Sequence, residues 1–104
     1  PQGMPCRIGE EVTVGHRAIL HACTIGNRVL VGMGAIVMDD VVVEDEVIIA
    51  AGSVVSPGKT LESGHLYVGA PARKIRPLSD EERTHLAESA HFYRELAQDH
   101  RTSE

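Results

Sequence analysis

His16 and His21 are the two residues of this sequence whose type and spacing fit a metal site. Four residues separate them, in a stretch that is otherwise apolar and rich in glycine. Neutral imidazole is the commonest metal ligand in proteins, and a catalytic zinc site typically has three protein ligands and an open position for water. Zinc lowers the pKa of that water to about 7. The pair therefore predicts a metal site, and the alternative is that both are simply exposed polar side chains.

An unbroken six-residue repeat surrounds the two histidines and predicts the fold. Each repeat unit is too short to bury its own apolar face, so three units make one triangular coil and stacked coils share a continuous core. We expect an all-β solenoid of about three coils over residues 1–77, followed by an α-helix over residues 78–104. Large aliphatic residues recur at every sixth position, with one step of five before Ile25: Ile8, Val14, Leu20, Ile25, Val31, Val37, Val43, Ile49, Val55 and Leu61.

Two other folds fit the repeat less well. A β-sandwich would place turn signals every eight to twelve residues, whereas this repeat is shorter. A helical interpretation fails because valine, isoleucine and glycine dominate residues 8–61, with no apolar stripe at helical spacing.

The repeat also predicts where the histidines point. They lie on successive repeat units, and neither takes the large aliphatic position that faces inward. Both side chains should therefore point away from the coil, which makes a three-ligand site difficult to complete within one subunit. A site shared between neighbouring solenoids fits this arrangement.

The two ends of the chain differ. Ser79 and Glu82 form a capping box, and Leu86, Ala90, Tyr93 and Ala97 recur at helical spacing, so a helix should run from near Ser79 to near Asp99. Its apolar stripe should dock on the solenoid or on a neighbouring subunit. The repeat is already established at Ile8 without a polar cap, which predicts that this is the C-terminal part of a longer solenoid.

Composition narrows the possible partners. The formal net charge of −5 argues against nucleic acid or an anionic membrane as a main partner. No segment has the length of a transmembrane helix, and no signal peptide is visible. Cys6 and Cys23 do not make a disulfide framework, and Cys23 should be a small buried hydrophobic residue. A reducing, cytoplasmic location is therefore expected.

Six stretches of the chain match one known family: residues 12–16 (Val-Thr-Val-Gly-His), 18–27, 31–35, 51–55, 66–72 and 75–78. They closely resemble the γ-class carbonic anhydrase-like hexapeptide proteins of bacteria. The resemblance covers nearly the whole chain, and the two-histidine motif is its most specific part. The segment Gly69-Ala70-Pro71-Ala72 is shared with hexapeptide acyltransferases and discriminates poorly.

The resemblance implies a left-handed β-helix, against the usual right-handed crossover, and a homotrimer. It implies a metal site at each subunit interface, with His16 from one chain and His21 from its neighbour. The metal would be zinc, or alternatively iron or cobalt, and the lyase reaction would be reversible hydration of CO2 to bicarbonate by metal-bound hydroxide. Tyr67 resembles a family tyrosine near the active site and is a catalytic candidate; the alternative is an aromatic ring packed over the last coil.

The sequence also departs from the family. A third histidine ligand from an earlier coil, and an upstream arginine, aspartate and glutamine, have no match here. His65, His85, His91 and His100 do not correspond to the missing ligand. We therefore expect this chain to carry two thirds of a metal site. Unless the missing part is supplied, metal binding should be weak and hydratase activity low or absent.

Two other functions fit the same fold, because fold does not settle function. An acyl-coenzyme A transferase would need a histidine general base beside an acceptor pocket and a groove for the coenzyme between coils. A non-catalytic trimeric scaffold would need neither. Metal content separates the hydratase from the transferase.

Overall fold

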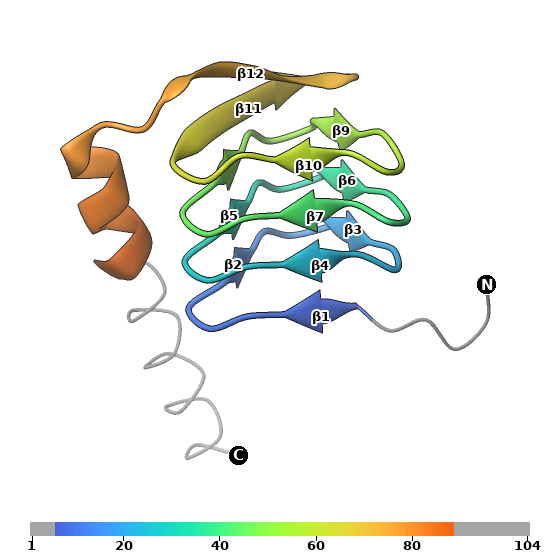
Figure 1. Ribbon diagram of the computed structural model, residues 1–104, viewed down its shortest axis with the longest axis horizontal. Coiled ribbons are helices and arrows are strands. Elements are labelled where there is room, and N and C mark those ends of the chain that lie inside the picture. The colour runs from blue at the N-terminus through green and yellow to red at the C-terminus, as the bar shows by residue number, and fades with distance from the viewer. Residues whose placement is uncertain (1–5, 89–104) are drawn as a thin grey trace.

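The computed structural model describes residues 6–88, which form a parallel β-solenoid followed by a helix (Figure 1). The solenoid consists of ten strands of two residues each and a longer terminal hairpin, β11 and β12. The strands are β1 (Arg7–Ile8), β2 (Thr13–Val14), β3 (Ile19–Leu20), β4 (Thr24–Ile25), β5 (Leu30–Val31), β6 (Ile36–Val37), β7 (Val42–Val43), β8 (Ile48–Ile49), β9 (Val54–Val55), β10 (Thr60–Leu61), β11 (His65–Gly69) and β12 (Ala72–Pro77).

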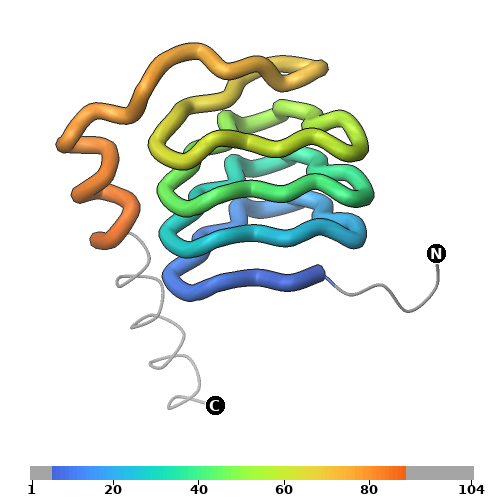
Figure 2. The backbone as a smooth tube through the Cα atoms, in the orientation of Figure 1, coloured from blue at the N-terminus to red at the C-terminus, as the bar shows by residue number. Residues whose placement is uncertain are grey.

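The strands stack into three sheets that form the three sides of the coil. Their orders are β1-β4-β7-β10, β12-β11-β8-β5-β2 and β3-β6-β9. Thr13 pairs with Leu30, and Leu30 pairs in turn with Ile48, so one coil takes three repeat units. In Figures 1 and 2 the front strands β1, β4, β7 and β10 run to the corner on the left, and the chain then returns behind them to the right. Each coil lies above the one before it. This winding is left-handed, and the predicted solenoid is confirmed.

The core lies inside the triangle and is made of aliphatic residues. Val31 and Ile49 stack above one another in register, and both are completely buried. Each fully buried valine or isoleucine contributes about 1.5–3 kcal/mol. The first described coil is the exception, because Ile8 and Val14 are 50% and 43% exposed with no described coil beneath them. The largest fully enclosed side chains are Ile25, Val29, Val31, Val37, Val41, Val43, Val47, Ile49, Ser53 and Val55.

Most corners of the coil have four residues, and the third of the four has a positive φ. Asp40 (φ 62°) and Gly58 (φ 76°) hold this place in two successive corners of the same column. The amide of the positive-φ residue donates to the coil below, as in Asp40 N to Ala22 O at 2.8 Å. The corner of residues 21–23 has three residues and no positive φ. The single five-residue step of the repeat therefore marks a corner from which this residue is missing.

The described part of the C-terminal helix covers residues 80–88. The predicted capping box is present: the amide of Glu82 donates to Ser79 Oγ at 3.1 Å, and the amide of Ser79 donates to Glu82 Oε1 at 2.8 Å. Leu86 is 3% exposed, and Arg83 donates to Glu46 at 2.9 Å. The helix thus docks on its own solenoid, beside β2, β5 and β8 (Figure 1). Its continuation to Asp99, with Ala90, Tyr93 and Ala97, lies outside the described residues.

The division at residue 77 stays a prediction, although β12 ends at Pro77 and the described helix begins at residue 80. Within residues 6–88, no helix has the length and apolar character needed to cross a membrane.

Close approach of the coils generates the first prediction. A Cβ on Gly32 would lie 2.5 Å from the backbone nitrogen of Ala51, whereas a Cβ on Gly34 would meet nothing within 4 Å. Gly32→Ala should therefore destabilise the solenoid by about 1–3 kcal/mol, the usual cost of overpacking. Gly34→Asn is the control, because asparagine tolerates positive φ. Urea unfolding midpoints would test this, and equal losses in both variants would contradict it.

The helix cap generates the second prediction. Hydrogen bonds from Arg76 and from the Ser79 amide lower the pKa of Glu82 to about 2 from its usual 4.5. A depressed carboxyl pKa stabilises the fold above about pH 4.5 and loses that effect as the pH falls towards 2. Wild type should therefore melt above Glu82→Gln at pH 6, and the difference should disappear near pH 2. Glu81→Gln is the control, and a Glu82→Gln difference independent of pH would contradict the prediction.

Candidate metal site

His16 lies in the corner between β2 and β3. The turn places the imidazole on the outside of the coil, where it is exposed, as the repeat predicted. Two features fix the local backbone: the next residue, Arg17, has a φ of 62°, and the amide of Gly34 donates to the His16 carbonyl at 2.9 Å. The backbone of this candidate ligand is therefore rigidly placed by the coil above it.

His21 begins the next corner, at the other end of β3. Its amide donates to Val37 O at 2.9 Å, and its side chain is 51% exposed. Nδ1 of His21 lies 3.8 Å from Oδ1 of Asp39, which belongs to the coil above. This separation is longer than a hydrogen bond, so Asp39 is a charged neighbour of the ring.

The two histidines do not converge within one chain. They flank β3 and occupy different corners of the triangle. Among residues 6–88, no group of three or more histidine, cysteine, aspartate or glutamate side chains could hold a metal ion. The donor set still suits zinc, because imidazole is one of its standard ligands. A metal held by these two outward imidazoles would therefore need further ligands from elsewhere.

The surface around His16 is hollowed and apolar. An open hollow of about 630 Å³ is lined by His16, Arg17, Met33 and Gly34. Met33 is 62% exposed, and Ile19, which faces outward on β3, is 48% exposed. Exposed apolar residues gathered beside a polar group are typical of an interaction surface.

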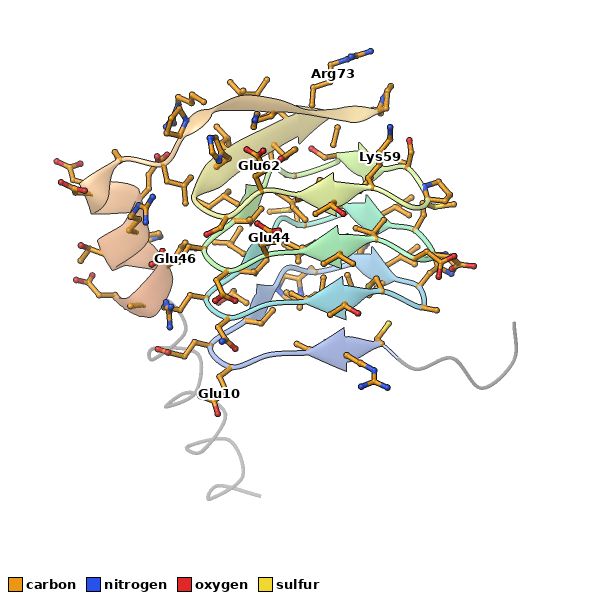
Figure 3. The ribbon with its side chains drawn as sticks, viewed as in Figure 1. Glu10, Glu44, Glu46, Lys59, Glu62 and Arg73 are labelled. Atoms are coloured by element: carbon orange, nitrogen blue, oxygen red, sulfur yellow. The ribbon has the colours of Figure 1, made fainter. Side chains whose placement is uncertain are left out.

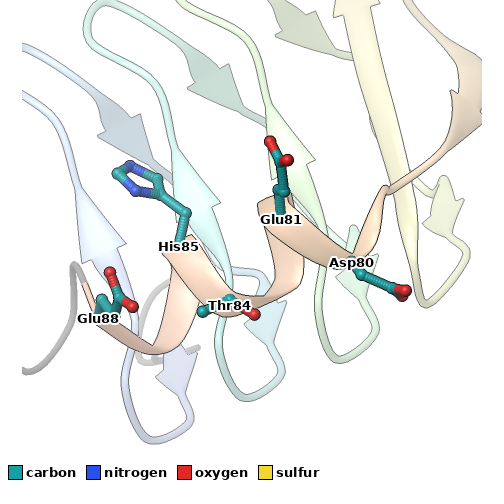
Figure 4. A pocket seen from close by; sticks show the side chains of 5 residues that line it. All are labelled: Asp80, Glu81, Thr84, His85 and Glu88. Carbon is teal, nitrogen blue, oxygen red and sulfur yellow. The ribbon is translucent and has the colours of Figure 1, made fainter.

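The C-terminal helix borders the same region. A smaller hollow of about 210 Å³ is lined by residues of β2, β5 and their corners, including His16 and Met33, together with His85. His85 also lines a third hollow of about 340 Å³ along the helix, with Asp80, Glu81, Thr84 and Glu88. Figure 4 shows His85 and Glu81 projecting from the same side of the helix. The helix therefore brings a third histidine towards the region of His16.

Tyr67 lies on β11, away from both histidines of the same chain. It is 6% exposed within the hydrophobic core, and its hydroxyl accepts a hydrogen bond from the Glu62 amide at 2.8 Å. Three strand spacings of sheet β11-β8-β5-β2, about 14 Å, separate it from Val14, which precedes the His16 corner. This position is that of a ring packed over the last coil, and a catalytic role for Tyr67 stays a prediction.

A pair of thiols adjoins the His21 corner. The Sγ atoms of Cys6 and Cys23 are 3.9 Å apart, and the Cys6 thiol also contacts the carbonyl oxygen of His21. Cys23 is 3% exposed, as predicted for a small buried residue. Burial, with the neighbouring Cys6, raises the pKa of the Cys23 thiol to about 12.

Acidic side chains follow a different edge of the solenoid. Glu10, Glu44 and Glu62 lie one above another along the corners that join the sheet of β1 to the sheet of β2 (Figure 3). Arg28 lies 3.7 Å from Glu11 and 3.6 Å from Glu46 on this edge. Part of the negative charge of the chain thus lies on this edge, away from His16 and His21.

Asp39 and the partnership of Cys6 with Cys23 are the features of this region that the sequence interpretation missed. Asp39 lies one full coil after His21 along the chain, and Cys23 lies one full coil after Cys6. Pairing residues that are one coil apart would have found both contacts.

Comparisons with known proteins agree with this architecture. The model of the bacterial transferase hexapeptide family (six repeats) matches residues 22–57. Protein YrdA of Escherichia coli is 61% identical over 93 residues, which are 89% of this chain and 50% of that protein. Mitochondrial gamma carbonic anhydrase 2 of Arabidopsis thaliana is 45% identical over 97 residues, 93% of this chain and 35% of that protein.

A solved structure shares the fold. The hexapeptide transferase family protein of Anaplasma phagocytophilum superposes with a TM-score of 0.83 at 42% identity, covering 90% of this chain and 61% of that one. The present chain thus spans about half or less of the curated relatives described here.

Proposed function

Because this chain belongs to the hexapeptide-repeat family that includes gamma carbonic anhydrases, we propose that it forms part of a metal-dependent hydratase that interconverts CO2 and bicarbonate. The observation that carries the proposal is the pair of outward imidazoles, His16 and His21. The chain that bears them is 45% identical to a gamma carbonic anhydrase over 93% of the present chain. Because the chain spans only part of these relatives, the activity belongs to the whole protein.

The site is proposed to lie between subunits of a homotrimer. His16 and His21 flank β3 and do not converge within one chain, so His16 of one subunit would meet His21 of the next. The exposed apolar side chains of Met33 and Ile19 beside them support an interface on this face. Closed rings of identical subunits repeat one such interface around the symmetry axis.

Each residue then has a limited role. His16 and His21 hold the metal, with zinc as the proposed ion and iron or cobalt as alternatives. Asp39 lies 3.8 Å from Nδ1 of His21, and a small rotation would bring it to hydrogen-bond distance, where it would orient that ring. When bound, zinc makes hydroxide available near neutral pH by lowering the pKa of water. The apolar wall formed by Met33 suits a small uncharged substrate such as CO2.

We also propose a reducing location, the cytoplasm, because the two cysteines of the chain do not make a disulfide framework. Carbon dioxide and bicarbonate are the proposed small-molecule partners, and the negative charge disfavours nucleic acid and anionic membranes.

An acyltransferase is the second candidate. It is favoured by the structural similarity to a hexapeptide transferase family protein at 42% identity. In that case His16 would act as a general base beside an acceptor, and no metal would be needed. A trimeric scaffold without catalysis is the third.

The third prediction separates these functions by metal content. The wild-type chain, dialysed against zinc, should be a trimer by light scattering and bind up to about one zinc per chain by elemental mass spectrometry. Binding should be weak because two ligands per site come from the described residues. His16→Ala and His21→Ala should each lose the zinc and remain trimers, whereas the control His65→Ala should keep it.

Mixing the two variants tests the shared site directly. Trimers refolded from equal amounts of His16→Ala and His21→Ala should recover zinc at about one quarter of their sites, because one interface of each mixed ring pairs two intact histidines. Cobalt absorption would report the ligand geometry in the same samples. Variants that bind as much zinc as wild type would contradict the proposed site. A trimer that binds no zinc would mean that this chain is a structural part, and that the activity must be sought in the whole protein.

A further inference from the structure

Cys6 and Cys23 occupy equivalent places on neighbouring coils. The residues that follow them, Arg7 and Thr24, pair in parallel register on β1 and β4, and the amide of Arg7 donates to the carbonyl of Cys23 at 2.9 Å. Both thiols are free, and their Sγ atoms are 3.9 Å apart. The backbone ladder therefore holds two thiol side chains next to each other.

This spacing is compatible with a covalent bridge. Neighbouring strands lie about 4.8 Å apart, which falls within the Cα separation of about 4.4–6.8 Å found in disulfides. The Sγ atoms, 3.9 Å apart, are closer to each other than the two strands are. Rotation of the side chains, with little movement of the coil, can therefore bring the sulfur atoms to bonding distance.

We propose that Cys6 and Cys23 are a reversible modification site that forms an intrachain disulfide on reaction with a low-molecular-weight disulfide such as oxidised glutathione. The Cys6 thiolate attacks one sulfur of that disulfide, which forms a mixed disulfide and releases one glutathione thiolate. Cys23 then attacks the Cys6 sulfur, which forms the Cys6–Cys23 bond and releases the second glutathione. The two protein thiols lose two electrons and two protons, and one glutathione disulfide becomes two glutathione thiols.

Accessibility sets the order of these two steps. Cys6 is exposed, whereas Cys23 is 3% exposed inside the coil. A bulky oxidant can therefore reach Cys6 but not Cys23. Cys23 acts only on a sulfur already positioned beside it.

Oxidation would act on the coil that carries His16 and His21. The bridge closes the chain between residues 6 and 23, which contains both histidines. It also removes the thiol proton with which Cys6 contacts the His21 carbonyl. This inference needs neither metal nor hydratase activity, so it stands or falls independently of the proposed function.

The fourth prediction tests the bridge by intact mass. The native chain is incubated with oxidised glutathione at pH 8, quenched in acid, denatured and treated with a maleimide. Wild type should lose two hydrogen atoms, take up no maleimide and carry no glutathione, and dithiothreitol should restore both thiols. Cys23→Ala should retain one glutathione on Cys6. Cys6→Ser should stay unmodified until it is denatured, and then take up one maleimide.

The thermal midpoint gives a second readout. A bridge that closes a loop of this length should raise the midpoint by an amount of the order of 10 °C, with no change on oxidant treatment of Cys6→Ser. Wild type that keeps two free thiols, accumulates a glutathione adduct or forms disulfide-linked dimers would overturn the proposal. A thermal midpoint of the oxidised protein equal to or below that of the reduced protein would contradict the proposed closure of the coil by the bridge.

Discussion

The backbone hydrogen bonds between successive coils are the constraint on which the rest of this structure depends. Each two-residue strand is too short to be stable alone, and it gains its partners only from the coils above and below it. The ladder brings the coils so close that a glycine is needed where one backbone crosses another, as at Gly32 below Ala51. It also sets a narrow triangular interior that β-branched side chains fill well. The stacking distance thus accounts for the glycine at the close approach, whereas strand length and the width of the core follow from the six-residue side of the triangle.

The same constraint determines where chemistry can occur. A filled triangular prism has no interior room for substrate, so polar functional groups must sit on the outer corners. His16 and His21 lie at the two ends of β3 and face outward, where a metal could be enclosed only by another surface. The exposed Met33 and Ile19 beside them make such a surface favourable to cover. An interface between subunits is therefore the arrangement in which this fold could both complete a metal site and shield it from bulk solvent.

Much of this architecture could be predicted from the sequence because the repeat is itself the structural unit. The period predicted the strands, the aliphatic core and the outward direction of the histidines, and Ser79 with Glu82 predicted the start of the helix. Contacts between side chains on neighbouring coils are harder to predict. The shortened corner changes the number of residues along the chain that separates paired positions, so this number differs from one coil to the next. Asp39 beside His21 and Cys6 beside Cys23 are examples. The surface on which the helix docks cannot be predicted from the sequence, because an apolar stripe does not specify which surface covers it.

The shortened corner at residues 21–23 connects these observations. The four-residue corners described here each contain a residue with positive φ, which costs a non-glycine residue about 1–2 kcal/mol. The corner at His21 omits that residue, and with it the amide that would donate to the coil beneath. The thiol of Cys6 contacts the carbonyl of His21 at this corner, and Asp39 of the coil above lies 3.8 Å from the His21 ring. A one-residue irregularity in an otherwise regular solenoid thus gathers an imidazole, a carboxylate and two thiols, which the regular corners do not do.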